Sequence, residues 1–160
     1  DCNFEKLRVV IHPQSIVHSF VHFFDGSVMA QLGQPDMRIP ISFCLGWPQR
    51  IASGSEELDI SQIRKLEFLE PDRKKFRSLD LAEFCLEIGM NSAIYLNSAN
   101  EVAVDAFLKR KIKFTTITHI VSEILEKANF HEPESIADVK DTDVEARAMA
   151  YQSLKKWNSR

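Results

Sequence analysis

Few glycines and cysteines occur in this sequence, and their scarcity excludes several classes of protein. Its five glycines in 160 residues are too widely spaced for a G-x-G-x-x-G fingerprint or a phosphate-binding G-x-x-x-x-G-K loop. The three cysteines, Cys2, Cys44 and Cys85, are widely spaced and form no C-x-x-C pair. This spacing argues against a zinc site or a disulfide framework and suits a reducing compartment. G-x-S-x-G and H-E-x-x-H motifs are also missing, so nothing supports a hydrolase or a zinc enzyme.

Long apolar runs and an excess of positive charge are missing too. No stretch approaches the roughly 18 apolar residues of a membrane span, and a net charge of -3 gives no broad basic surface for nucleic acid. We therefore expect neither a membrane nor a nucleic-acid partner. The chain starts at Asp1 without a methionine and soon becomes strand-like, so we expect a piece of a longer globular protein.

The first third of the chain predicts β-structure. Residues 7–12, 16–24 and 27–32 are rich in β-branched and aromatic side chains. Asp25-Gly26 predicts a hairpin turn between the last two segments, because glycine accepts a positive φ. Both faces of the middle segment carry apolar side chains, which predicts a sheet covered on both sides.

Residues 36–45 predict a short helix interrupted by Pro40 and ended by Trp47-Pro48, and residues 65–68 are a further strand candidate. Later apolar residues recur with helical periodicity. The predicted helices cover residues 79–88, 92–107, 115–128 and about 141–157. The fold class is α+β: a short, mostly antiparallel β-sheet, a linker and a C-terminal four-helix bundle-like domain. The predicted boundaries are 1–48, 49–75 and 76–160.

Three histidines are the first candidates for chemistry. His18 and His22 have the spacing of a helical metal pair, but on a strand they lie about 13 Å apart and cannot share an ion. A single histidine, such as His12 or His18, could hydrogen-bond a polar or phosphorylated substrate. The residues alone favour the alternative, a satisfied histidine in the core or an interface.

Two polar clusters in the helical region have structural explanations. Asp143 and Glu145 could meet a cation, but we expect them in a first helical turn, where carboxylates favour capping and the helix dipole. Residues 96–101 (L-N-S-A-N-E) are unusually polar for a helix interior. We expect them to form a polar network between helices rather than a catalytic site.

Several motifs resemble one enzyme family. Residues 10–19 (V-I-H-P-Q-S-I-V-H-S), 25–28 (D-G-S-V) and 30–38 (A-Q-L-G-Q-P-D-M-R) are similar to the 1-deoxy-D-xylulose 5-phosphate reductoisomerases, as are residues 96–102 and 112–115. The resemblance implies part of an NADPH-dependent enzyme that uses Mg or Mn and converts 1-deoxy-D-xylulose 5-phosphate to 2-C-methyl-D-erythritol 4-phosphate. It also implies the end of a catalytic domain and a complete C-terminal helical domain.

The same resemblance implies which residues face the substrate. Ser15 and His18 match pocket residues, and Pro35 and Met37 match an apolar wall beside the sugar phosphate. The family's metal-binding carboxylates and NADPH site lie upstream, so no catalytic, cofactor or metal residue is assigned here, and the chain alone is expected to be inactive. The strands are expected to form a homodimer interface. Asn97, Asn100 and Glu101 match positions to which we assign a structural role.

Two other functions stay open at this point. One is a non-enzymatic dimerisation module, which would not need His18 or residues 35–37 (P-D-M). The other is a binding protein for a sugar phosphate, which would need a phosphate cradle that the sequence does not show. For the reductoisomerase we expect a bacterial cytoplasmic location, with a plastid as the alternative.

Overall fold

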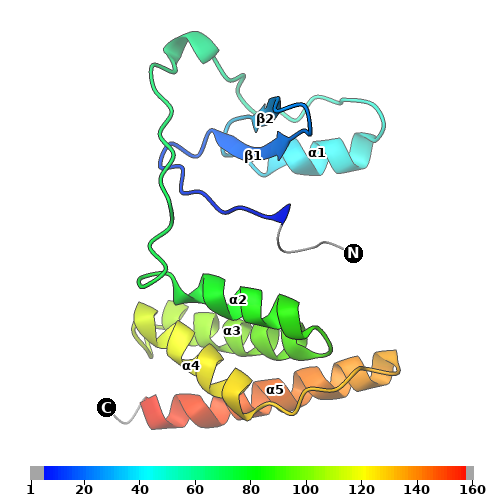
Figure 1. Ribbon diagram of the computed structural model, residues 1–160, viewed down its shortest axis with the longest axis vertical. Coiled ribbons are helices and arrows are strands. Elements are labelled where there is room, and N and C mark those ends of the chain that lie inside the picture. Colours follow the sequence, from blue (N-terminus) through cyan, green and yellow to red (C-terminus); the bar gives the residue numbers. More distant parts are fainter. Residues whose placement is uncertain (1–5, 158–160) are drawn as a thin grey trace. The chain divides into compact units, whose positions relative to one another are not determined.

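The computed structural model describes residues 6–157, which form two compact units (Figure 1). The sheet unit spans Arg8–Pro71, and the helical unit holds the helices that follow Asp72. Strands lie only in the first and four long helices only in the second, so the α+β fold class is confirmed. Residues 49–71 group with the sheet unit, and a linker at 49–75 stays a prediction.

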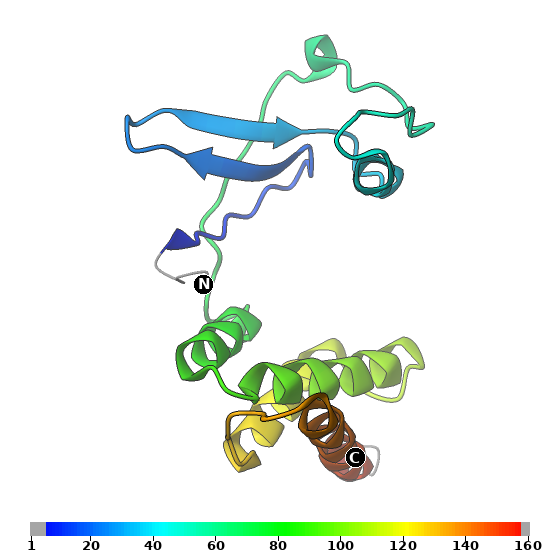
Figure 2. The same cartoon turned by 90° about the vertical axis from the view of Figure 1, so that its right-hand side faces the viewer.

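The sheet unit is built around an antiparallel hairpin, whose two strands run side by side in Figure 2. Strand β1 (Val17–His22) pairs with β2 (Val28–Leu32). The turn confirms the Asp25-Gly26 prediction: Gly26 has φ 85°, and the Asp25 carboxylate accepts hydrogen bonds from the Ser27 backbone N–H at 2.9 Å and hydroxyl at 2.6 Å. Glycine is favoured here because other residues rarely adopt this backbone conformation.

Two predicted strands are wrong. Within the described residues, segments 7–12 and 65–68 contain no strand, and a single bridge joins Ile11 to Leu69. Pro13 has no N–H to extend a ladder. The carbonyl oxygen of Glu67 is bound by the His12 ring at 2.8 Å rather than by a backbone N–H, so side-chain bonding replaces strand pairing at this point.

The prediction of a sheet covered on both faces is also wrong for this chain. Apolar side chains of the hairpin are exposed, with exposed fractions of 52% at Val21, 47% at Phe23 and 63% at Met29. Phe20 meets Phe68 edge to face, with ring centroids 5.2 Å apart. Within Arg8–Pro71 these side chains therefore stay exposed to solvent.

Helix α1 (Arg38–Gly46) follows the hairpin, and a single 3-10 turn, η2 (Ile60–Gln62), comes later in the same unit. The prediction that Pro40 interrupts this helix is wrong. Pro40 is the third residue of α1, where a backbone N–H would have no helical partner, so the proline is tolerated there. The helix ends immediately before Trp47-Pro48, which confirms the predicted end.

The helical unit consists of α2 (Arg77–Ile88), α3 (Ser92–Leu108), α4 (Phe114–Lys127) and α5 (Ile136–Trp157). In both Figures 1 and 2, α3 lies against α4 and α5. Alanines at the contact, including Ala99 and Ala103 of α3 and Ala146 and Ala150 of α5, are fully buried and let the helices approach closely. The larger core side chains are Tyr95, Ile120 and Ile124.

Local signals mark the end of α2 and the start of α5, although α5 starts earlier than predicted. Gly89, with φ 67°, ends α2 as predicted, and its N–H donates to the Cys85 carbonyl at 2.9 Å. Helix α5 begins at Ile136 instead of near residue 141. Ser135 supplies the missed signal, since its hydroxyl accepts the Asp138 N–H at 3.1 Å. No helix in residues 6–157 is long and apolar enough to cross a membrane.

Candidate functional site

The sheet unit contains a cavity of about 540 Å³ between the hairpin and α1. Three of the four residues predicted to face the substrate line it: His18, Pro35 and Met37. Ser15 is exposed and is not part of this lining. The other lining residues come from the end of β2, the following loop, α1 and the segment after it: Gln31, Gly33, Gln34, Asp36, Ile39, Pro40, Phe43 and Arg50.

His18 reaches the cavity from an irregular position in β1. Val17 pairs with Leu32 and Ser19 with Gln31, so His18 is an extra residue on its strand, a β-bulge. Bulges bend a strand locally and redirect a side chain. A side chain added at Gly33 would lie 3.8 Å from the imidazole Cε1, which places the His18 ring beside the loop that carries Pro35.

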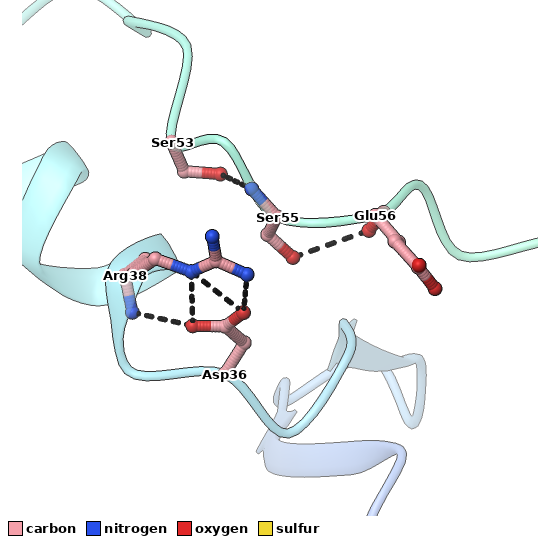
Figure 3. Close-up of polar contacts among 5 residues, drawn as sticks. All are labelled: Asp36, Arg38, Ser53, Ser55 and Glu56. Carbon is pink, nitrogen blue, oxygen red and sulfur yellow. Dashed lines mark hydrogen bonds and ion pairs between the residues drawn. The ribbon is translucent and has the colours of Figure 1, made fainter.

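The P-D-M loop (residues 35–37) is held by the Asp36 carboxylate (Figure 3). Asp36 Oδ1 accepts the Arg38 backbone N–H at 2.9 Å and Nε at 3.1 Å, and Oδ2 accepts Nε at 2.9 Å and Nη2 at 2.5 Å. Hydrogen bonds from Arg38 lower the pKa of Asp36, and the same bonds raise the pKa of Arg38. Because Asp36 lies between Pro35 and Met37, these bonds fix the backbone that carries the apolar wall.

A second loop passes the Arg38 guanidinium in Figure 3. Ser55 donates its backbone N–H to the Ser53 hydroxyl at 3.1 Å, and Gly54 has φ 73°. A Cβ at Gly54 would lie 3.7 Å from Nη1 of Arg38. Glu56 adds a smaller charge contribution that also raises the pKa of Arg38. The Arg38 guanidinium therefore binds the P-D-M loop and lies close to the segment around Gly54.

An aromatic ring and a cation complete the cavity. The Arg50 guanidinium carbon lies 4.2 Å from the centroid of the Phe43 ring, a cation–π contact. Phe43 in turn meets Trp47 edge to face at 5.4 Å. Besides its apolar walls, the cavity carries possible hydrogen-bond donors on His18 and Arg50, and the Asp36 carboxylate is paired with Arg38. Sequence reasoning did not single out Arg50 or Phe43, because their contact depends on how α1 ends.

The polar residues of α3 form a structural network with α5. The Ser98 hydroxyl donates to the Asp143 carboxylate at 2.5 Å. Arg147 donates to the same carboxylate at 2.9 Å and to the Glu101 carboxylate at 2.6 Å. Hydrogen bonds from Arg147 and then Ser98 lower the pKa of Asp143. The predicted network between helices is confirmed. The placement of Asp143 in a first helical turn was wrong, since α5 begins seven residues earlier.

Residues 6–157 form neither a metal-binding cluster nor a glycine-rich nucleotide loop. No group of three His, Cys, Asp or Glu in residues 6–157 is placed to hold a metal ion. His18 and His22 lie on one strand with three residues between them, and no carboxylate completes a set with either. The glycines lack the spacing of a nucleotide-binding loop.

Comparisons with known proteins agree with the motifs. The family model for the DXP reductoisomerase C-terminal domain matches residues 32–149. The 1-deoxy-D-xylulose 5-phosphate reductoisomerase of Cellvibrio japonicus is 47% identical over 152 residues, which cover 95% of this chain and 38% of that protein. The Saccharophagus degradans enzyme is 47% identical over 157 residues, covering 98% and 40% respectively.

Solved structures give the same result. The reductoisomerase of Zymomonas mobilis in complex with NADPH superposes with a TM-score of 0.86 at 40% identity, covering 96% of this chain and 40% of that one. A DOX-P reductoisomerase in complex with NADPH, fosmidomycin and magnesium gives 0.83 at 42% identity, covering 91% and 38%. This chain thus spans about 40% of the length of its relatives, and it belongs to the DXP reductoisomerase C-terminal domain family.

Proposed function

We propose that this chain supplies one wall of the substrate pocket and the C-terminal helical domain of an NADPH-dependent 1-deoxy-D-xylulose 5-phosphate reductoisomerase. The observation that carries the proposal is the shared cavity of His18, Pro35 and Met37, three residues that the motifs assign to the substrate pocket. The reaction is a rearrangement of the sugar-phosphate carbon skeleton followed by reduction to 2-C-methyl-D-erythritol 4-phosphate.

In this role the residues of the chain bind and orient the substrate. His18 can donate a hydrogen bond to a phosphate or hydroxyl oxygen, and Arg50 adds positive charge to the same cavity. Pro35 and Met37 exclude water from one side of the sugar. We propose that NADPH and a divalent metal are held by the part of the relatives' length that this chain does not span.

The exposed apolar face of the hairpin supports a proposed homodimer. Side chains such as Val21, Phe23 and Met29 would lose contact with water if a second copy paired there. The same observation favours the alternative function, a dimerisation module without catalysis. A bacterial cytoplasmic location is proposed from the bacterial relatives.

A hybrid enzyme separates these functions. In the hybrid, this chain replaces the matching 38% of the Cellvibrio japonicus reductoisomerase. Substrate-dependent NADPH oxidation is measured for the hybrid and for the isolated chain. We expect turnover by the hybrid and none by the chain. A folded, dimeric hybrid without activity would favour the dimerisation module, and turnover by the isolated chain would refute the assignment of NADPH and metal to other segments.

A further inference from the structure

Ser15 has an unusual backbone conformation. Its φ is 53°, in the left-handed region that non-glycine residues seldom adopt. Its N–H donates to the His12 carbonyl at 3.1 Å, which closes a turn with Pro13 and Gln14 at the centre. Strained conformations of this kind persist only where the surrounding structure holds them, and they are frequent at binding sites.

A segment more than fifty residues later holds this turn. The Gln14 side chain donates to the Glu67 carboxylate at 3.0 Å and accepts the Glu67 backbone N–H at 3.2 Å, which makes a closed pair of hydrogen bonds. The His12 ring donates through Nδ1 to the Glu67 carbonyl at 2.8 Å, since a carbonyl oxygen can only accept. His12 also stacks on Phe68, with ring centroids 4.7 Å apart.

The chain is fixed on both sides of Ser15. On the N-terminal side, Ile11 and Leu69 exchange two backbone hydrogen bonds of 2.8 and 2.9 Å. On the C-terminal side, the Gly33 N–H donates to the Ile16 carbonyl at 3.0 Å. The hydrogen bonds of Gln14 and His12 to Glu67 thus form a clamp on the turn, and this clamp acts on the backbone that carries the Ser15 hydroxyl.

We propose that Glu67 and Gln14 are positioning residues for Ser15. The Ser15 hydroxyl is exposed and outside the lining of the cavity between the hairpin and α1, and these two residues hold it where the proposed enzyme would contact the phosphorylated sugar. This inference rests on the proposed function, because Ser15 is a substrate residue only in a reductoisomerase. Glu67 acts through Gln14 and the turn, and it does not touch the substrate. Removing the Glu67 side chain therefore weakens substrate binding through Ser15 and leaves the chemical step unchanged.

Steady-state kinetics of the hybrid enzyme test the positioning role. We expect Glu67→Ala and Gln14→Ala each to raise KM about fivefold, the effect of about one lost hydrogen bond, with kcat within about twofold. Glu67→Gln, which keeps an acceptor for Gln14, should rescue KM. Glu70→Ala is the matched control, because Glu70 lies on the same segment and its side chain is 80% exposed.

A double substitution distinguishes positioning from a general structural role. In a Ser15→Ala background, Glu67→Ala should leave KM unchanged, because the hydroxyl through which Glu67 acts is already gone. A further rise in KM in that background, or a fall in kcat with KM unchanged, would overturn the proposal.

Amide hydrogen exchange of the 160-residue chain tests the clamp independently of enzyme activity. We expect faster exchange of the Ser15 amide in Glu67→Ala than in the unsubstituted chain or in Glu70→Ala. Equal exchange in all three would refute the clamp, whatever the hybrid does. If hydrogen exchange shows the clamp in the chain but the unsubstituted hybrid has no activity, the result would count against the proposed function and not against the clamp.

Discussion

Glu123 of α4 lies at the centre of a charged cluster that should make the helical unit sensitive to acid. Its carboxylate is 2.5 Å from Lys127 Nζ and 3.1 Å from Lys156 Nζ, and it accepts the Ser153 hydroxyl at 2.7 Å. Hydrogen bonds from Lys127 and then Ser153 lower the pKa of Glu123 from 4.5 to about 2. Burial opposes this shift, with the side chain 25% exposed.

A lowered carboxylate pKa stabilises the folded state above the unfolded-state pKa. The stabilisation is fully present above about pH 4.5 and is lost as the pH falls towards about 2. A shift of this size corresponds to about 3 kcal/mol at most. The two lysine side chains are 53% and 66% exposed, so solvent screening reduces the expected contribution to about 1–2 kcal/mol.

Glu123→Gln is the substitution that isolates this charge, because glutamine still accepts the Ser153 hydroxyl. We expect it to lower the free energy of unfolding by about 1–2 kcal/mol at neutral pH and by much less at about pH 3. The assay is urea denaturation followed by helical circular dichroism. Glu126→Gln, on the same helix, is the control. An equal loss at both pH values, or an equal loss in the control, would refute the reasoning.

Three further outcomes are expected. Tyr95→Phe should leave the free energy of unfolding within about 0.5 kcal/mol or raise it, because the buried Tyr95 hydroxyl lies near Glu145 and the Asn129 backbone but makes no hydrogen bond of good geometry to residues 6–157; a loss above about 1 kcal/mol in urea denaturation contradicts this. Asp36→Ala should speed hydrogen exchange of the Arg38 amide more than Asp36→Asn does, since asparagine keeps an acceptor; equal exchange contradicts the loop's dependence on Asp36. Val21→Lys should weaken dimerisation in sedimentation experiments, because it places a charge on the exposed apolar hairpin face; an unchanged dimer contradicts that interface.

Local rules of sequence predicted the elements whose signals lie within a few residues. Asp25-Gly26 specified the hairpin turn, and Gly89 specified the end of α2. Helical periodicity located the four long helices. The start of α5 was missed because the predicted start relied on the acidic residues after Lys140, whereas the actual cap, Ser135, is a single residue.

The predictions that failed depend on contacts between distant residues. A strand at 7–12 was expected from composition, but Glu67 binds the His12 ring and leaves a single bridge between Ile11 and Leu69. The bulge at His18 is invisible to strict alternation, which assumes one residue opposite each partner. Nothing in the local sequence indicates which segment will oppose the strand.

The candidate site was predicted in part, and from resemblance rather than periodicity. His18, Pro35 and Met37 share a cavity, while their contact with substrate stays a prediction. Arg50 and Phe43 were missed, because their cation–π contact joins α1 to the segment that follows it. The Glu67–Gln14 pair was missed for the same reason, since 53 positions separate the two residues.

The most direct test of the substrate-pocket assignment is kcat/KM for His18→Asn in the hybrid enzyme, measured beside His22→Asn. His18 lines the cavity, whereas His22 lies at the other end of the same strand. We expect His18→Asn to lower kcat/KM by roughly tenfold or more, as for a lost hydrogen bond to a charged group, and His22→Asn to change it by less than about twofold. Equal effects of the two substitutions, or no loss with His18→Asn, would contradict the account.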